Sequence, residues 1–449
     1  MKKEFSLRII ESAGFYYPNS SGGTEVYVSS LAKNLKMHGI ECIVAAPSQS
    51  KEASRYDHEG VAVFRYPVPQ RWSRYETQGR KKPWKFDVFE DWLRDQRADI
   101  YHQHSWTTGC GLWHLKAAKR LGIKTVVTVH VPANVCMRGT MLYEGRAACD
   151  GKIVPERCAS CWLQSKGIAA GAARTVAKLP QRLAPLMRLP RLGPVLAAKA
   201  LAVSRKNGLQ EMVAEADRIV AVCAWLYDAL LANDVPPGKL VLNRQGAGEG
   251  TKFKPLSRMN DAPNVFRFGF LGRWDAVKGV HILVEAFKRV PADLQVELHI
   301  CGTGTGTASE KYRCDVQRAA ACDQRIQFLP AAAHEKVGAF LAGVEALTVP
   351  SQWMETGPLV VLEAFAARTP VIGSDLGGIK ELVSHGHDGL LVAHDDVSAW
   401  TAAMVRLATD RALLQRMRQG IGPVRTMSDV SHDMAMLYQE VCAVDTYAT

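Results

Sequence analysis

The chain has 449 residues, of which 47% are hydrophobic and 22% are charged, and no low-complexity tract interrupts it. That length allows two or three domains with separate cores, and the composition is that of a soluble enzyme. The sequence holds no run of about 18 uninterrupted apolar residues of the kind that spans a membrane. Glu4, Arg8 and Glu11 stand where a signal peptide needs an apolar segment, so we expect a cytoplasmic protein.

The net charge of +12 is concentrated in one segment. Nine cations lie between Lys166 and Lys206, and no acidic residue lies between Arg157 and Gln210. The basic character therefore describes this segment rather than the whole chain. Because no helix-turn-helix, zinc-finger or RNA-binding signature accompanies it, we expect no nucleic-acid partner.

Apolar runs alternate with helical patterns along nearly the whole chain, which is typical of parallel α/β sheets. A first set of strands is predicted at residues 7–12, 42–47, 61–67, 100–103, 125–130 and 218–223, with helices such as 24–38 and 109–121 between them. A second set is predicted at 267–272, 295–301, 325–329, 346–350, 371–374 and 389–392. Two such sets predict an α/β protein with two Rossmann-like, doubly wound domains.

The domain boundary is predicted in the polar, Gly- and Pro-rich stretch 246–263. The assigned segments are an N-terminal domain at 1–247, a C-terminal domain at 264–427 and a terminal helix at 428–449. Two irregular insertions stand out in the N-terminal domain, at 68–85 and at about 131–210. Loops of that length inside a compact domain are usually functional.

Two features of the N-terminal half lie at strand ends, where such sheets bind ligands. Gly22 and Gly23 follow the first strand and open a helix, and paired glycines let the backbone approach a ligand and leave N–H groups free for it. The spacing matches neither a dinucleotide-binding loop nor a Walker loop, which argues against a nicotinamide enzyme. His130 ends a predicted strand, where it is either a ligand-facing side chain or a satisfied structural histidine.

A pair of cations brackets the turn after the first strand of the C-terminal half. Arg273 and Lys278 can both point to the mouth of the sheet, and a diphosphate with about two to three negative charges needs such partners. A solvated loop is the alternative for this turn.

The strongest signal is the segment from Glu355 to Glu363. Pro358 suits the first turn of a helix, so Glu355 precedes that helix and faces outward from the carboxyl end of the strand 346–350, whereas Glu363 is expected to be the more buried carboxylate. The backbone N–H groups of residues 356–360 offer an anion site for a phosphate. A helix cap with an ordinary surface glutamate is the alternative.

In combination these motifs resemble the family-4-type retaining glycosyltransferases of the GT-B fold. The resemblance covers nearly the whole chain and rests on Gly22-Gly23, Thr128-x-His130, Gly272-Arg273 with Lys278-Gly279, Glu355-x7-Glu363 and Gly377-Gly378-x-x-Glu381. It implies two domains that close over a nucleotide-sugar donor, and retention of the anomeric configuration. It also implies a last helix, about 429–442, that crosses back onto the first domain.

The resemblance further implies a role for each site residue. Arg273 and Lys278 would hold the donor diphosphate. Glu355 would contact the donor sugar hydroxyls and Glu363 the ribose, while His130 would lie near the anomeric carbon. The other substrate-binding residues would be Gly22 and Gly23, facing the phosphate and the acceptor, and Thr356, Gly357, Pro358 and Leu359, completing the phosphate and sugar cradle. Fixed cations and dipoles stabilise a leaving diphosphate without reorganising. Because no Asp-x-Asp motif is recognisable, we expect no catalytic divalent metal.

Four cysteines cluster in the long insertion: Cys136, Cys149, Cys158 and Cys161. One Cys-x-x-Cys pair with two further thiols suits a four-thiolate site for structural zinc or an iron–sulfur cluster, which can hold together a loop that lacks a core. Free thiols are an alternative, and disulfides are a weaker one in a reducing cytosol.

The basic segment Lys166–Lys206 mixes its cations with Leu, Val, Ala and Met, while four prolines forbid one continuous helix. Short amphipathic pieces on an anionic membrane surface fit this composition, and a flexible solvated lid is the alternative. The membrane interpretation predicts a peripheral protein on the inner face of the membrane and a lipid-linked saccharide as acceptor.

We therefore expect a glycosyltransferase that moves a sugar from a nucleotide-diphosphate sugar to a saccharide or lipid-linked saccharide in cell-surface polysaccharide assembly. One alternative is a GT-B nucleotide-sugar 2-epimerase, although such enzymes usually lack this pairing of motifs. The other is a non-catalytic nucleotide-sugar-binding protein, and measuring glycosyl transfer separates the two classes.

Overall fold

The computed structural model describes residues 7–18, 22–73, 76, 79, 81–182, 185, 192–248, 265–304, 306–332 and 336–443. The chain forms two compact units, called unit 1 (Met1–Arg244 and Met427–Thr449) and unit 2 (Gln245–Thr426). Most of the predicted boundary stretch 246–263 lies outside the described residues. Ala247, which the sequence assigned to the first domain, falls in unit 2 because its N–H donates to the Arg425 carbonyl and it bridges to Thr426.

Unit 1 is built on an eight-stranded sheet with the order β10-β9-β6-β5-β1-β2-β4-β3. The strands are β1 (Leu7–Ser12), β2 (Ile40–Ser48), β3 (Ser54–His58), β4 (Val61–Pro67), β5 (Ile100–Gln103), β6 (Lys124–Val129), β9 (Arg218–Ala221) and β10 (Leu240–Leu242). All neighbours pair in parallel except the edge strand β3, which runs antiparallel to β4. The hydrophobic runs that predicted these strands are buried, with Ile9 and Ile10 of β1 fully covered.

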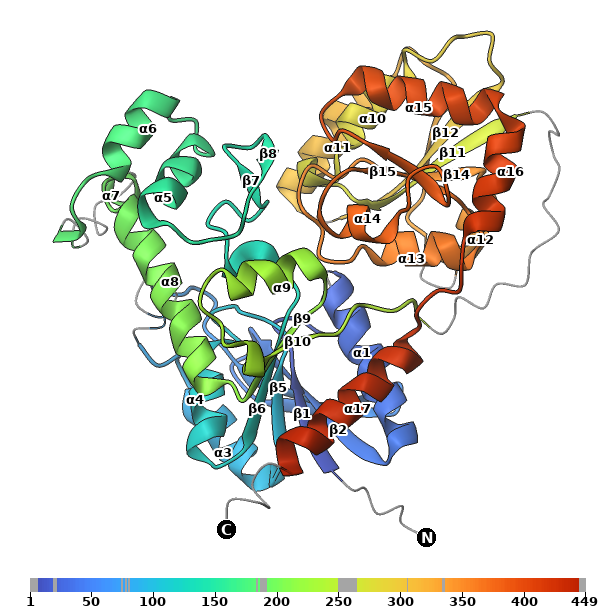
Figure 1. The fold of residues 1–449 in the computed structure, drawn as a ribbon. Helices are drawn as coiled ribbons and strands as arrows, with labels where there is room; N and C mark the ends of the chain where they lie inside the picture. The colour runs from blue at the N-terminus through green and yellow to red at the C-terminus, as the bar shows by residue number, and fades with distance from the viewer. Residues whose placement is uncertain are drawn as a thin grey trace. The chain divides into compact units, whose positions relative to one another are not determined.

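Most connections between the parallel strands contain a helix, whereas the parallel strands β2 and β4 are joined through the edge strand β3. The helices are α1 (Gly23–Leu35), α3 (Phe86–Gln96), α4 (Leu112–Arg120) and α9 (Ala224–Leu231), and α17 (Met427–Ala443) ends the described chain. Figure 1 shows α17, in red, among the blue elements of unit 1 although it comes from the other end of the sequence. Its buried face, with Val430, Met434 and Tyr438, joins the same hydrophobic core as α1 and β1.

The long insertion of unit 1 carries its own small structure after β6. Its elements are the 3-10 turn η2 (Pro132–Asn134), the hairpin β7 (Leu142–Tyr143) and β8 (Ala147–Ala148), and the helices α5 (Pro155–Gln164), α6 (Ala170–Ala177), α7 (Gly193–Leu196) and α8 (Ala198–Glu215) (Figure 1). A cluster of small side chains, including Ala159, Leu163, Ala173 and Ala198, packs α5, α6 and α8 together. The basic segment is therefore broken into short helices, while Arg188 and Arg191 lie outside the described residues.

Unit 2 is built on a six-stranded parallel sheet with the order β13-β12-β11-β14-β15-β16. The strands are β11 (Phe266–Arg273), β12 (Val296–Thr303), β13 (Ile326–Leu329), β14 (Ala346–Val349), β15 (Val371–Ser374) and β16 (Gly389–Val392). The helices are α10 (Val280–Phe287), α11 (Thr307–Ala320), α12 (Val337–Ala342), α13 (Leu359–Ala366), α14 (Gly377–Leu382), α15 (Val397–Thr409) and α16 (Arg411–Gly420). The predicted fold class is confirmed, with two parallel-sheet units of the Rossmann-like type.

The strand order fixes where each unit can bind a ligand. In both sheets the order of strands reverses beside the first strand, between β1 and β5 in unit 1 and between β11 and β14 in unit 2. Open α/β sheets bind ligands outside the carboxyl ends of the strands at such a switch point. No helix among the described residues is long and apolar enough to cross a membrane.

Candidate functional site

The switch point of unit 2 carries the two cations predicted to bind a diphosphate. Arg273 is the last residue of β11 and is exposed to solvent. The chain then turns through η6 (Ala276–Lys278), which is capped by the Asp275 carboxylate accepting from the Val277 N–H at 3.1 Å. Lys278 therefore lies on a short structured turn, and α10 begins at Val280.

Gly279 allows this turn to lie against the end of β14. Its φ is +72°, and a β-carbon there would overlap the Pro350 carbonyl oxygen. The Gln352 N–H donates to the Val277 carbonyl at 2.7 Å, which joins the two loops. The close approach of the backbones thus explains why a glycine follows Lys278.

Lys278 and Glu355 form an ion pair in this site, with Nζ 2.6 Å from Oε1. The Ser351 hydroxyl donates to the same carboxylate oxygen at 2.7 Å, and the Lys278 ammonium lies 5.5 Å from the centre of the Trp353 ring. Burial raises the pKa of Glu355, but the Lys278 ammonium and the hydrogen bonds to the carboxylate outweigh it and hold that pKa below its usual value. Glu355 is therefore an ionised, oriented acceptor beside a fixed cation.

The prediction that Glu363 is the more buried carboxylate is wrong. Glu355 is 5% exposed and Glu363 is 9% exposed. The sequence pattern suggested otherwise because Glu355 precedes the helix. The chain folds back over it, since the Gly378 N–H donates to the Glu355 carbonyl at 2.6 Å. The two carboxylates are thus both covered.

Glycines allow the backbone to pack tightly around residues 354–357. A β-carbon on Gly378 would lie 2.7 Å from the Glu355 carbonyl oxygen and 2.8 Å from the Gly357 nitrogen, and Gly377 has a φ of +48°. Pro358, with extended backbone, is the cap residue before α13 rather than its first turn. The loop Thr356–Pro358 therefore leads directly into the N-terminus of α13 at Leu359, whose first N–H groups have no partner within the helix.

In unit 1 the glycine pair is placed at the start of α1, with Gly22 as its cap residue and Gly23 as its first residue. The Gly22 N–H donates to the Glu25 carboxylate at 3.0 Å. This N–H group is therefore not free for a ligand, contrary to the prediction. The φ of Gly22 is −167°, which is extended backbone open to any residue. Ser20 and Ser21 of the same motif lie outside the described residues.

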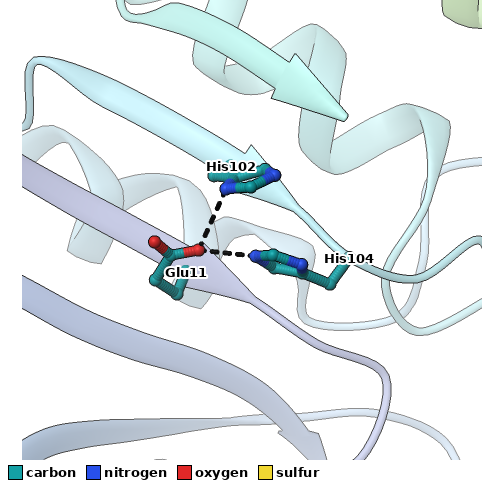
Figure 2. A group of neighbouring side chains, drawn as sticks. All are labelled: Glu11, His102 and His104. Carbon is teal, nitrogen blue, oxygen red and sulfur yellow. Dashed lines mark hydrogen bonds and ion pairs between the residues drawn. The ribbon is translucent and has the colours of Figure 1, made fainter. Parts of the chain in front are cut away.

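A buried polar cluster occupies the switch point of unit 1. Figure 2 shows one carboxylate oxygen of Glu11, on β1, linked both to His102 of β5 and to His104 just beyond that strand. The Glu11 Oε2 atom lies 2.6 Å from His104 Nε2 and 3.2 Å from His102 Nδ1. Burial raises the pKa of Glu11, but the two histidines hold it far below its usual value. Burial, with nearby His102, lowers the pKa of His104 to about 4.

The ligand atoms of this cluster lie within 4.8 Å of one another, close enough to hold a metal ion. Each of them, however, already has a hydrogen-bond partner. The Tyr438 hydroxyl of α17 donates to Glu11 at 3.0 Å and lies 2.6 Å from His102 Nδ1, while Thr128 Oγ1 lies 2.7 Å from His102 Nε2. The cluster is therefore a satisfied hydrogen-bond network in which a metal would have to displace existing partners.

His130 is the outer member of this network. It follows β6, is 6% exposed, and its Nε2 lies 3.1 Å from His104 Nδ1. Burial, with neighbouring His104 and His102, lowers the pKa of His130 well below its usual value. Because the ionised Glu11 can only accept, His104 Nε2 donates to it, so the neutral His104 accepts at Nδ1 from His130 Nε2–H. The chain Glu11–His104–His130 thus sets both the orientation and the tautomer of His130.

Sequence analysis missed the inner part of this network. The sequence analysis considered Glu11 only as a charged residue near the N-terminus, and it did not identify His102 or His104 as candidate site residues. An alternating His-x-His at the end of a strand is the signal that could have found them, because residues two apart on a strand lie on the same face of the sheet.

A large groove lies beside these strand ends in unit 1, with a volume of about 1080 Å³. Four tryptophans line it, from the loop after β4, the loop after β5, α4 and α5: Trp72, Trp106, Trp113 and Trp162. The Trp113 indole N–H is buried and has no hydrogen-bond partner among the described residues. Helix α8 also lines the groove, with residues that include Ser204 and Arg205.

The basic segment has acidic partners outside itself. Arg174 lies 3.5 Å from Glu144, and Lys199 lies 2.6 Å from Glu156. Burial lowers the pKa of Arg205, which lines the groove. Some of the described cations of this segment are therefore paired or partly buried, and attachment to an anionic membrane stays a prediction.

The fold matches solved glycosyltransferases over nearly its whole length. Sucrose-phosphate synthase from Thermosynechococcus elongatus aligns with a TM-score of 0.67 at 18% identity, covering 98% of this chain and 100% of that one. Anabaena HepE in complex with UDP and glucose aligns with a TM-score of 0.63 at 14% identity, covering 96% and 99%. The fold is thus the GT-B fold of these structures.

Two family profiles cover most of the sequence. Residues 22–246 match the glycosyl transferase 4-like domain, and residues 265–410 match the glycosyl transferases group 1. The chain belongs to the glycosyl transferase 4-like family. A curated relative is the D-inositol 3-phosphate glycosyltransferase of Stackebrandtia nassauensis, which is 26% identical over 89% of this chain and 82% of its own length.

Proposed function

We propose that this glycosyltransferase moves a sugar from a nucleoside diphosphate sugar to a saccharide acceptor, with retention of configuration. The observation that carries the proposal is the ion pair of Lys278 with Glu355 at the switch point of unit 2, where Arg273 ends β11 and the loop after Glu355 leads into α13. Two cations and a helix N-terminus suit a diphosphate, and an oriented carboxylate suits sugar hydroxyls.

The donor would bind to unit 2 with its diphosphate on Arg273 and Lys278. Backbone N–H groups at Gly357 and Leu359 would complete the cradle, and Glu363 on α13 would accept from the ribose. Departure of the nucleoside diphosphate places negative charge on the leaving oxygen. Cations and N–H dipoles that are already fixed stabilise that charge without reorganising, which is usually the largest catalytic contribution.

Lys278 has to serve two partners in this mechanism. In the structure its ammonium is held by Glu355 at 2.6 Å, and its side chain is 20% exposed. A bound diphosphate would take part of that interaction, which leaves the Glu355 carboxylate free to accept from the sugar. The ion pair therefore holds both groups in place before the donor arrives.

The acceptor would bind in the groove of unit 1. Tryptophan rings offer flat apolar faces with a polar edge, and the unpartnered Trp113 N–H suits a sugar hydroxyl. A volume of about 1080 Å³ is at the upper end of small-molecule pockets and accommodates more than one sugar ring. Chemically, the lining favours a saccharide of several units.

The name of the Stackebrandtia relative suggests a second acceptor, D-inositol 3-phosphate. A phosphate monoester prefers several cations. Among the described charged residues that line the groove, the cation Arg205 is matched by the carboxylates of Glu76 and Glu211. That balance of charge favours the uncharged saccharide over the phosphorylated inositol.

His130 would lie beside the reacting carbon of the donor, oriented by the chain from Glu11 through His104. A neutral imidazole with its Nε2–H committed to His104 is a fixed dipole rather than a titrating base. Its role would be to position and polarise, and the glutamate would act on it only through the intervening ring.

The test has two acceptor arms. A panel of UDP-, GDP- and ADP-sugars is first screened by thermal shift, because a ligand that binds the folded state stabilises it. Release of nucleoside diphosphate is then measured with an oligosaccharide mixture or with D-inositol 3-phosphate. We expect nucleoside diphosphate release that depends on the saccharide. Trp106→Ala should raise the KM for the saccharide several-fold, whereas the control Trp84→Ala, at an exposed tryptophan, should leave that KM unchanged. Release with the inositol phosphate alone would overturn the acceptor assignment.

A further inference from the structure

The four clustered cysteines converge on one small cavity in the insertion of unit 1. Cys136 follows η2, Cys149 follows β8, and Cys158 and Cys161 lie one turn apart on α5. All four line a single cavity of about 20 Å³, and none of them forms a disulfide. Three separate pieces of chain thus each place at least one cysteine in the lining of the same cavity.

The lining of this cavity has the chemistry of a thiolate metal site. Its other members are apolar, such as Val135 and Leu142, or cationic: Arg138, Lys152 and Arg157. Four thiolates around one divalent ion leave a net charge of −2, which such cations offset. Soft sulfur ligands in a set of four select zinc or iron, and structural zinc sites are closed and tetrahedral.

The size of the cavity favours a single metal ion over an iron–sulfur cluster. A space of about 20 Å³ holds one water or one ion. A cluster of four irons with its bridging sulfides is several times larger. We propose that Cys136, Cys149, Cys158 and Cys161 bind one structural zinc ion.

The surrounding backbone supports the sulfur atoms. The Glu144 N–H donates to Cys161 Sγ at 3.3 Å, and the Cys149 N–H donates to the Met141 carbonyl at 2.8 Å. Such outer hydrogen bonds orient metal ligands. Met141 and Glu144 have φ values of 56° and 50°, so the hairpin adopts a sharply turned shape that ordinary loop preferences do not favour.

The loop is anchored to the rest of unit 1 on the other side of the cavity. The Asn233 side chain donates to the Gly151 carbonyl at 2.8 Å and accepts from the Ile153 N–H at 2.8 Å. Among the described residues, the group of Glu11, His102 and His104 has its ligand atoms within 4.8 Å of one another, and the four thiols do not form such a group. Zinc binding therefore requires a short closing movement of the hairpin, consistent with metal sites that form as the loop folds.

The zinc would also order one wall of the groove described above. Met137 follows Cys136 and Trp162 follows Cys161, and both line that groove. The effect on acceptor binding rests on the proposed function, whereas the metal content does not. Failure of the two proposals can therefore be told apart.

Elemental analysis of the full chain, purified without added metal and without a His-tag column, tests the site. We expect one zinc per chain in the wild type and in the control Cys314→Ser, whose cysteine is exposed on α11 of unit 2. Cys158→Ser and Cys161→Ser should each hold at least tenfold less zinc. Wild type refolded with Co²⁺ should show the intense sulfur-to-cobalt absorption of a four-thiolate site.

Three results would overturn the proposal. The first is zinc-free, folded wild-type protein whose refolding with Co²⁺ gives no sulfur-to-cobalt absorption. The second is iron with acid-labile sulfide in place of zinc. The third is full zinc content in both serine variants. If the variants do not fold, the wild-type metal content and the cobalt spectrum still decide the matter.

Discussion

Replacing Glu355 by glutamine should separate catalysis from nucleotide binding. The amide keeps the size of the side chain and can still accept from the Ser351 hydroxyl, which lies 2.7 Å away. It removes the negative charge that pairs with Lys278 at 2.6 Å. If Glu355 accepts from the donor sugar, turnover should fall by about 30- to 1000-fold, because one such interaction in a covered site is worth about 2–4 kcal/mol in the transition state.

The affinity for the nucleoside diphosphate should rise or stay the same in this variant. A charge-assisted hydrogen bond of this kind is worth about 1.5–3 kcal/mol, and Lys278 no longer has to give it up when the diphosphate binds. Calorimetric titration with the nucleoside diphosphate should therefore show a Kd that is unchanged or up to about tenfold lower. Ser351→Ala is the matched control, since it removes a neutral partner of the same carboxylate oxygen and should cost much less turnover.

The dependence on pH adds a second check. The pKa of Glu355 lies below its usual value of 4.5, so the wild-type carboxylate stays ionised above about pH 5. The rate profiles of wild type and Glu355→Gln should therefore have the same shape from about pH 5 to pH 9 and differ only in height. A variant that keeps wild-type turnover, or that loses nucleotide binding together with turnover, would refute this assignment of Glu355.

Three further predictions follow from the same structure. Arg273→Ala should lower kcat/KM by about 2–4 kcal/mol, or 30- to 1000-fold, measured as acceptor-dependent diphosphate release, and wild-type kinetics would contradict its diphosphate role. Glu11→Gln should lower kcat about tenfold or more. It should also change the tautomer of His130, because a glutamine no longer forces His104 to donate to residue 11. The ¹⁵N chemical shifts of the His130 ring report that tautomer, and unchanged shifts would contradict the positioning role of Glu11. Burial lowers the pKa of His114 to about 3, so the folded state favours the neutral ring and loses stability as the pH falls from about 6.5 towards 3. His114→Asn should reduce the slope of unfolding free energy near pH 5 by about 1.3 kcal/mol per pH unit, and denaturant melts of equal slope would contradict it.

The sheets were predictable from the sequence because their strands are buried on both faces. Each predicted strand has a counterpart, as with residues 7–12 and β1 or residues 389–392 and β16. The strands that were missed are half-exposed or short: β3 at the sheet edge, β10, and the hairpin of β7 and β8. An edge or a two-residue strand carries too little hydrophobic periodicity to stand out.

The sequence predicted which residues belong to the candidate site, but it did not predict which of them contact one another. Strand ends located Arg273, Lys278 and His130, because parallel strands place such residues on one edge of a sheet. The ion pair of Lys278 with Glu355 joins residues 77 positions apart, and Tyr438 meets Glu11 across 427 positions. Pairings of that kind depend on the packing of α17 and of the loop over Glu355, which no local pattern encodes.

The most direct test of the proposed function is a transfer reaction with a labelled nucleotide sugar, the purified chain and a saccharide acceptor. Mass spectrometry should show one glycosyl residue added to the acceptor, and NMR of the product should show the anomeric configuration of the donor. Arg273→Ala in the same assay should give little product. Tight nucleotide-sugar binding without any transferred sugar, or a product of inverted configuration, would contradict the proposed function.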